Sequence, residues 1–431
     1  CSHENASVPF IPVPGNLYEK YKTMHELGVY AAMQCWYFGN YPGLMNKAAG
    51  ELSFEPFPQS EDEFLTMLAR PEWRRHTPKV VEAWKYFSEG YQKFPGNIAF
   101  EWFGPLHHSI AWPLHLFPVD EPVSPSWILK NFPEVSGDRI GECLIYQHTL
   151  AEGLTLCREM YELWQKGTDI LESLRGDYSD DPARIADINL ARAISLQMRS
   201  TLNLLAFYSL REEMFFERKD NLEALRGIVQ DEIRNSRSMK QLCEQDSRLG
   251  YHSEAEGYLF FPEKLEARVA LLEQLLDVDF PKFRMDAPFI AEYTGENPVG
   301  AKSVCRRGTP SGNMEKAGGT GISWTSYYDE QMLSIVVEGS EGKAFTVEIE
   351  PCRLWPPVRI DFDQSGKPVL YSFIFREIPS VEYVRENGRL TIRIPMEVFD
   401  GFRRKNFPMR FNLWSGTDGW VRREPWTSRL L

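Results

Sequence analysis

The sequence lacks basic tracts. Its 431 residues include 48 Lys and Arg against 61 Asp and Glu, so that the formal net charge is −13. Proteins that bind nucleic acid need clustered Lys and Arg to neutralise phosphates. Only short pairs such as Arg403-Arg404 and Arg422-Arg423 occur here, and we interpret them as solvated surface. The charge therefore argues against nucleic acid as a partner.

Paired cysteines and long apolar runs are missing too. The seven cysteines are scattered with no CxxC or other metal-ligand spacing, and their odd number argues against a complete disulfide framework. We therefore predict buried free thiols, and we expect neither a metal site nor a cofactor. No apolar run approaches the roughly 20 residues of a membrane span, and no signal peptide is present. The sequence thus predicts no transmembrane segment.

Aromatic residues, by contrast, are abundant. Trp, Tyr and Phe make up 13% of the chain, and 43% of all residues are hydrophobic. Buried aromatics dominate core energetics, and the same planar side chains stack on sugar faces. The excess permits a carbohydrate ligand without establishing it. The length predicts two or three domains.

Residues 1–135 have the pattern of an α/β region with long loops. A helix is predicted over 16–27, and residues 29–36 form an almost continuous apolar run typical of a strand buried on both faces of a parallel sheet. Further helices are predicted over 61–69 and 79–93. A helix followed by a buried strand is half of a barrel or doubly wound repeat.

Residues 136–281 contain almost no proline and show helical periodicity. We predict helices over 139–174, 182–218, 222–243 and 262–276. Apolar stripes, which in the second of these helices include Ile194 and Met198, define a buried face and predict an antiparallel helical bundle. The connection over 246–257 is polar and unusually long.

Residues 282–431 change to a period of two, with short apolar alternations separated by Gly, Pro, Asn and Asp. Asn387-Gly388 is a strong hairpin signal, and many short strands with regular turns predict a β-sandwich. Strands are predicted over 333–337, 345–349, 359–362, 371–375, 390–394 and 410–413. The predicted fold is thus multidomain α+β.

Two carboxylates are candidates for catalysis. Glu4, preceded by His3, comes just before a proline-rich loop, and Glu101 opens a segment with two Trp and two adjacent His. Glycosidases commonly use two carboxylates, and Glu101 is the stronger acid/base candidate. The alternative for Glu4 is a solvated side chain near a terminus.

Polar-tipped aromatics supply candidate sugar contacts. Trp36, Tyr37, Asn40 and Tyr41 follow the predicted buried strand, where aromatic faces and an amide would suit a sugar ring and its hydroxyls. The alternative is that Trp36 caps the core beneath it.

A second group of candidate sugar contacts follows Glu101 and recurs in the long helical connection. Trp102, His107, His108 and Trp112 follow Glu101, and His252 lies in the connection over 246–257. For most of these side chains the alternative is a structural loop anchored by buried Trp, and for His252 it is a solvated loop. Neighbouring His on one strand point apart, which argues against a metal at His107 and His108.

Trp324, Tyr327, Tyr328, Trp355, Trp414, Trp420 and Trp426 are many aromatics for the 282–431 region. A sandwich core commonly takes one or two Trp, so we expect some of these rings to be exposed for sugar stacking.

Three sets of motifs carry a resemblance to bacterial glycoside-hydrolase-like proteins. The first resembles the last repeat of a (β/α)8 barrel and consists of His3-Glu4, the loop over 8–13, and Trp36 with the turn over 39–42. The connection over 246–257 is similar to one in the helical domain that follows such barrels. The last region resembles family 9 carbohydrate-binding modules through residues 327–333, 349–351, 394–396 and 411–413.

The resemblance implies three domains: the C-terminal part of a glycosidase-type barrel (1–135), a helical bundle (136–281) and a carbohydrate-binding-module-like sandwich (282–431). It implies a secreted or periplasmic bacterial glycoside hydrolase acting on a poly- or oligosaccharide. The alternative is a non-catalytic glycan-binding or scaffold protein. Because position 1 is interior in such proteins, we expect the chain to be a fragment whose upstream barrel carries the partner of Glu4; a processed lipoprotein beginning at Cys1 is the alternative.

Overall fold

The structure is a computed structural model, and the fold is described over part of the chain. The described residues are 7–32, 43–96, 109–119, 137–138, 140, 148, 150–252, 257–294, 303–308, 315–317, 321–350, 358–369, 381–396, 410–414 and 428–430.

The chain divides into two compact units, which we describe separately. The first comprises residues 1–138, 150–211 and 221–282, and the second comprises residues 139–149, 212–220 and 283–431. The described part of the first unit is almost entirely helical, whereas strands dominate the second. The predicted α+β class is therefore confirmed.

Four helices come from the first predicted region, and α1 ends as the sequence predicts. Gly28 adopts φ +71°, and the N–H of Val29 donates to the carbonyl of Met24 (2.9 Å), closing the helix. The helices are α1 (Pro14–Glu26), α2 (Leu44–Glu51), α3 (Glu61–Trp73) and α4 (Thr77–Tyr91).

The predicted buried strand is wrong where it can be checked. Residues 29–32 lie in no helix or strand, and Val29 and Tyr30 are 46% and 100% exposed. The N–H of Val29 belongs to the cap of α1, and a strand needs neighbours that pair its other backbone groups. The remainder, 33–36, lies outside the described residues. The first unit's described residues contain only the two-residue strands β1 (Tyr251–His252) and β2 (Gly257–Tyr258), so no barrel closure is shown.

The helix α4 packs closely on α7 (Leu150–Glu172). The rings of Phe87 and Trp164 stack with centroids 4.3 Å apart, and a Cβ at Gly167 would lie 2.5 Å from Phe87. Glycine at 167 therefore sets how close the two helices come. The indole N–H of Trp164 donates to the carbonyl of Ala191 (3.1 Å) and so ties α7 to the next helix.

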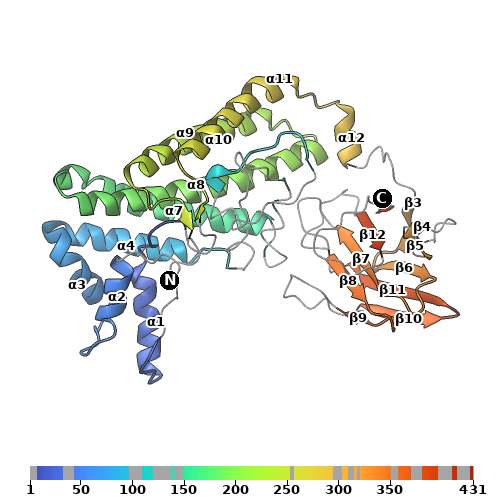
Figure 1. The fold of residues 1–431 in the computed structure, drawn as a ribbon, viewed down its shortest axis with the longest axis horizontal. Coiled ribbons are helices and arrows are strands. Elements are labelled where there is room, and N and C mark those ends of the chain that lie inside the picture. Colours follow the sequence, from blue (N-terminus) through green and yellow to red (C-terminus); the bar gives the residue numbers. More distant parts are fainter. Residues whose placement is uncertain are drawn as a thin grey trace. The chain divides into compact units, whose positions relative to one another are not determined.

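Three long helices complete the first unit, and α9 and α10 run side by side (Figure 1). Their bounds confirm the predicted helices to within two residues at each end. They are α8 (Pro182–Phe216), α9 (Leu222–Gln245) and α10 (Pro262–Gln274). The other predicted helix corresponds to α7, which begins at Leu150 rather than at residue 139.

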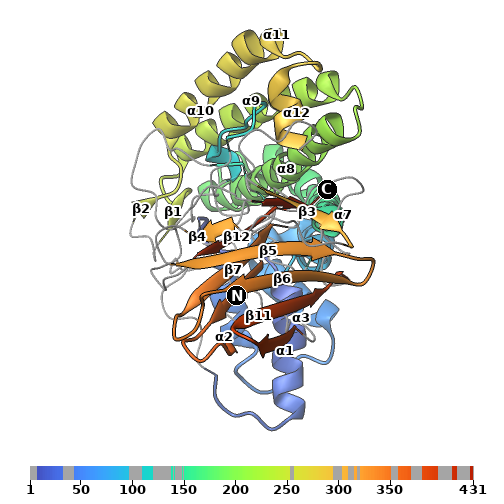
Figure 2. The same cartoon turned by 90° about the vertical axis from the view of Figure 1, so that its right-hand side faces the viewer.

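In the second unit the strands follow one hydrogen-bonded path, part of which is visible in Figure 2. The order is β10-β11-β6-β5-β3-β13-β12-β7-β8-β9, with β4 paired to β5. All pairings are antiparallel except those of β3 with β13 and with β5. The strands are β3 (Ser303–Arg307), β4 (Glu315–Ala317), β5 (Ile322–Tyr328), β6 (Met332–Glu338), β7 (Phe345–Glu350), β8 (Val358–Phe362), β9 (Pro368–Val369), β10 (Glu382–Glu386), β11 (Arg389–Pro395), β12 (Arg410–Trp414) and β13 (Ser428–Leu430). The short helix α12 (Pro288–Thr294) precedes them, and α11 (Phe280–Lys282) ends the first unit.

The hairpin predicted at Asn387-Gly388 is confirmed. Both residues have positive φ (47° and 77°), as the tight turn between β10 and β11 requires. The alternation is confirmed in β6, where Leu333, Ile335 and Val337 are fully buried. The strand predicted over 371–375 lies outside the described residues.

Candidate functional site

The structure describes two of the twelve predicted site residues, Trp112 and His252. Outside the described residues lie both predicted catalytic carboxylates and eight of the predicted sugar contacts: Glu4, Glu101, His3, Trp36, Tyr37, Asn40, Tyr41, Trp102, His107 and His108. Described segments follow both carboxylates in the sequence, beginning at Ser7 after Glu4 and at Ser109 after Glu101.

The segment after Glu4 is fastened to the middle of α8. The side-chain amide of Gln197 donates to the hydroxyl oxygen of Ser7 (Nε2–Oγ, 2.5 Å). The carbonyl of Ser7 accepts from the N–H of Gly250 (2.7 Å), two residues before His252. Ser7 is fully buried. Ser7 therefore joins the N-terminal segment to α8 and to the β1–β2 hairpin.

The segment after Glu101 reaches the same turn of α8. Ser109 begins the 3₁₀ turn η3 (Ser109–Ala111), and its hydroxyl donates to the carbonyl of Gln197 (3.2 Å). It also lies 3.2 Å from the hydroxyl of Thr201. Gln197 thus contacts the segments that follow both predicted catalytic carboxylates. Its side chain binds Ser7, after Glu4, and its backbone carbonyl binds Ser109, after Glu101.

The β1–β2 hairpin places His252 at this junction in a buried position, 3% exposed. Gly250 has φ +87°, and a Cβ there would lie 2.0 Å from the carbonyl oxygen of Phe260. Only glycine fits this approach. The solvated alternative for His252 does not describe its observed position.

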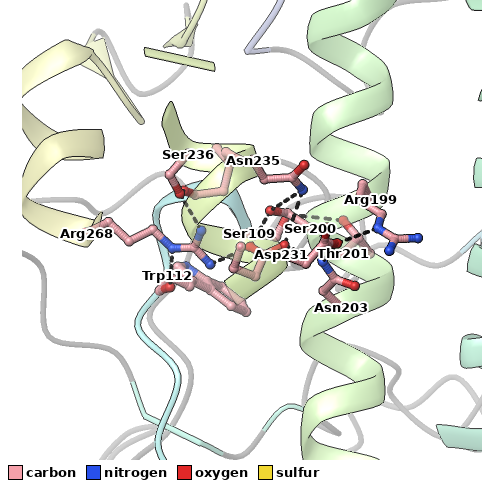
Figure 3. A network of polar contacts seen from close by, with 12 residues as sticks. Ser109, Trp112, Arg199, Ser200, Thr201, Asn203, Asp231, Asn235, Ser236 and Arg268 are labelled. Atoms are coloured by element: carbon pink, nitrogen blue, oxygen red, sulfur yellow. Dashed lines mark hydrogen bonds and ion pairs between the residues drawn. The ribbon is translucent and has the colours of Figure 1, made fainter. Parts of the chain in front are cut away.

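A buried ion pair beside this junction holds the η3 segment (Figure 3). Arg268 of α10 uses all three of its nitrogens: Nε donates to the carbonyl of Trp112, Nη1 to the hydroxyl of Ser236 and Nη2 to Glu232, each at 2.7 Å. The side chains of Arg268 and Glu232 are each 1% exposed. Arg268 thereby connects α9, α10 and the end of η3.

The Glu232 carboxylate is saturated with donors. Besides Arg268, it accepts from the Ser200 hydroxyl (2.5 Å) and from the amides of Asn203 (2.6 Å) and Asn235 (3.2 Å). A charge buried this deeply is tolerated when paired and fully hydrogen-bonded. Glu232 therefore has the contacts of a structural anchor.

Asp231, next to Glu232 on α9, faces Arg199 and Asn203 of α8 (Figure 3). It accepts from Arg199 (2.7 Å), Asn203 (2.8 Å) and Arg234 (3.0 Å). Burial by itself would raise the pKa of Asp231, but the hydrogen bonds from Asn203 and Arg199 lower it overall. Asp231 therefore stays ionised at neutral pH.

A second buried ion pair holds the chain beyond η3. Arg211 and Asp138 are paired at 2.9 Å with almost no exposure. Arg211 also donates to the carbonyl of His115 (2.7 Å), and Asp138 accepts from the N–H of Val119 (3.2 Å). The described stretch after the Glu101 segment is therefore pinned at Ser109, Trp112, His115 and Val119.

Trp112 occupies an anchoring position in this arrangement. Its side chain is 2% exposed, and its carbonyl is held by Arg268. A ring that stacks on a sugar needs an exposed face, so in this conformation Trp112 fits the structural alternative, a loop anchored by buried Trp.

Of the aromatics singled out in the second unit, Trp324 is fully buried, whereas Tyr327 and Tyr328 are partly exposed. Trp414 lies on β12. Trp355, Trp420 and Trp426 fall outside the described residues, so exposure of tryptophans for stacking stays a prediction.

Sequence reasoning missed the residues that hold this junction, namely Gln197, Glu232 and Arg268. A signal exists for Gln197, which stands beside the apolar stripe residues Ile194 and Met198, where a polar side chain needs a buried partner.

The part of the chain that the structure describes shows no group of three or more His, Cys, Asp or Glu arranged to hold a metal ion. None of its helices is long and apolar enough to cross a bilayer. Cys157 and Cys243 are buried free thiols, as predicted. Neither a protein-family model, nor a curated protein, nor a solved structure matches the chain.

Proposed function

We propose that this chain is part of a carbohydrate-processing protein, a glycoside hydrolase-like protein that acts on a poly- or oligosaccharide. The proposal retains the barrel end, the helical bundle and the carbohydrate-binding-module-like sandwich that the sequence motifs imply. It places the predicted site where the segments that carry Glu4, Glu101 and His252 adjoin α8.

The observation that supports it is the shared anchorage on Gln197. Ser7 follows Glu4 by three positions in the sequence, and Ser109 follows Glu101 by eight. The described chain that follows each predicted carboxylate is thus fastened at Gln197. Hydrolysis of glycosidic bonds needs two carboxylates roughly 5–10 Å apart. A residue that holds two segments distant in sequence can bring a carboxylate from each segment to such a separation.

In the second unit, the support for a sandwich is a set of buried apolar rows. Trp324, Val337 and Leu390 are register neighbours on β5, β6 and β11, and all are buried. Phe345 and Phe362 form a stacked, buried pair on β7 and β8, with centroids 4.7 Å apart. A sandwich buries one apolar face of each of two sheets in this way.

The test is a screen for reducing-sugar release and for glycan binding, made on the gene product that contains this chain. Glu4→Gln and Glu101→Gln are compared with Glu223→Gln, which alters a glutamate that is 84% exposed. If the two carboxylates act in catalysis, each loss lowers the rate by about 10²–10⁴-fold, and the control retains full turnover.

Unchanged turnover in both variants would remove Glu4 and Glu101 from the chemistry. Saturable glycan binding with no hydrolysis in the wild-type protein would favour the non-catalytic alternative.

A further inference from the structure

A cavity of about 340 Å³ lies in the first unit, in the size range of small-molecule sites. It is bounded by α2, α3, α4, α7, the first turns of α8 and the loop residues Phe10, Pro12 and Arg248. Its polar lining consists of Asn46, Lys47, Glu72, Arg184, Asp187 and Arg248, and its apolar lining includes Phe10, Trp73 and Trp84.

Arg184 dominates this lining. Its side chain is 9% exposed, one terminal nitrogen donates to Glu72, and the other lies 3.1 Å from a carboxylate oxygen of Asp187. The guanidinium covers the ring of Trp73 at 5.1 Å. Its Nε–H is buried and has no hydrogen-bond partner within the described part of the chain. A buried donor of this kind calls for an acceptor.

With Asp246 counted as the partner of Arg248, the charges around the cavity balance while Asp187 is ionised and leave one positive charge once Asp187 is protonated. Three cations (Lys47, Arg184 and Arg248) stand among the lining residues against two carboxylates. Lys47 pairs with Glu72, and Arg248 makes a two-pronged contact with Asp246, 2.6 Å at its shortest. Burial raises the pKa of Asp187 to about 6 despite the nearby Arg184, so its negative charge is lost in mild acid.

We propose that this cavity binds a small hydroxycarboxylate, whose carboxylate accepts the Nε–H of Arg184 and whose hydroxyls bond to Glu72 and Asn46. Arginine is suited to carboxylates because its nitrogens form a planar fork. The aromatic lining serves as an apolar wall, since Trp73 and Trp84 are buried. The proposal does not rest on the proposed function.

Asp187 makes this binding depend on pH. It faces Arg184 and Asp181 at the start of α8, Lys47 of α2, Glu72 of α3 and Arg248 after α9. An ionised Asp187 competes with the ligand for Arg184 and repels its charge. Affinity should therefore rise as the pH falls through about 6, while a ligand carboxylate with a pKa of about 4 stays ionised.

The experiment is calorimetric titration of the chain with gluconate at about pH 7.5 and about pH 5, with glucose and acetate as probes that lack the charge or the hydroxyls. Wild type should bind gluconate several-fold more tightly at the lower pH and about tenfold more tightly than either other probe. Arg184→Gln should weaken binding by about tenfold or more. Asp187→Asn should tighten it several-fold at the higher pH and abolish the pH dependence. Arg234→Gln, at an arginine that is 67% exposed, is the matched control and should bind as wild type does.

The proposal is overturned if gluconate at roughly 10 mM gives no binding heat at either pH, or if glucose binds equally well. It is also overturned if folded Arg184→Gln binds normally. Should Arg184→Gln fail to fold, Asp187→Asn decides, and an unchanged affinity in that variant contradicts the proposal. None of these results bears on Glu4 or Glu101, so the proposed function is tested separately.

Discussion

Two arginine–carboxylate sites lie along α8, and they differ in how fully the arginine is hydrogen-bonded. Beside the middle of the helix, Arg268 has a partner for every nitrogen, and Glu232 accepts from four residues. At the start of the helix, Arg184 pairs with two carboxylates but keeps a buried Nε–H unpaired beside a cavity. Arg268 therefore serves as a structural anchor, whereas Arg184 keeps an N–H that can donate to a ligand.

The largest expected effect comes from breaking the saturated site. Arg268→Met leaves the Glu232 carboxylate buried without its cation and releases the carbonyl of Trp112. Removing one partner of a buried pair costs about 3–5 kcal/mol, and we expect a loss of that size in the free energy of unfolding. Urea denaturation followed by helical circular dichroism measures it.

Arg237→Met is the matched control on α9. Arg237 pairs with Glu273 at 2.6 Å, but the two side chains are 58% and 47% exposed. An exposed pair contributes under about 1 kcal/mol. Equal losses in the Arg268 and Arg237 variants would mean that burial adds nothing to the Arg268 pair.

The helices around these sites were predictable, and the contacts between them were not. A proline at the first helical position and a continuous apolar stripe placed α8 at 182–218, close to the observed Pro182–Phe216. The ion pair between Glu232 and Arg268 depends on how α9 and α10 are aligned. The hydrophobic periodicity of each helix contains no information on that alignment. Arg184 and Asp187 have the sequence pattern of a solvated first turn, so the cavity had no signal.

The failed strand has a related cause. The apolar run over 29–36 indicates a preference for burial, but it does not show whether neighbouring strands or helices are present to bury it. Over 29–32 the predicted strand pairing is absent: the N–H of Val29 caps α1, and Tyr30 is fully exposed. Ten of the twelve predicted site residues fall outside the described part of the chain, so only Trp112 and His252 can be compared with their predicted roles.

An intermediate effect is expected at the junction of Ser7 and Ser109. Gln197→Leu keeps the side-chain volume but removes the hydrogen bond to Ser7, leaving a buried hydroxyl to find another acceptor or donor. We expect a loss of about 1–3 kcal/mol in unfolding free energy, less than for Arg268→Met because no charge is left unpaired. Hydrogen exchange should also quicken at Gly250, whose N–H donates to the Ser7 carbonyl. Unchanged exchange at Gly250 would argue against a shared anchor.

The smallest effect depends on pH and comes from the cavity. In the fold the pKa of Asp187 rises from 3.8 to about 6, so the folded chain binds a proton more tightly than the unfolded chain does. Asp187 therefore favours folding most below about pH 4, and this contribution is lost as the pH rises through about 6. Asp187→Asn should exceed the wild type by about 1–2 kcal/mol at pH 8 and match it near pH 4, allowing for solvent screening of a partly exposed group.

Asp231→Asn gives the opposite sign and so sharpens the comparison. Although burial would raise the pKa of Asp231, its hydrogen bonds lower it in the fold, so its stabilisation is present above about pH 4 and is lost as the pH falls further. That variant should be less stable than the wild type at pH 8, with the gap closing in acid. The measurement is the unfolding free energy of wild type and both variants from about pH 4 to 8. If the two differences changed with pH in the same direction, the contrast between the hydrogen-bonded Asp231 and the desolvated Asp187 would fail, because burial alone would then govern both carboxylates.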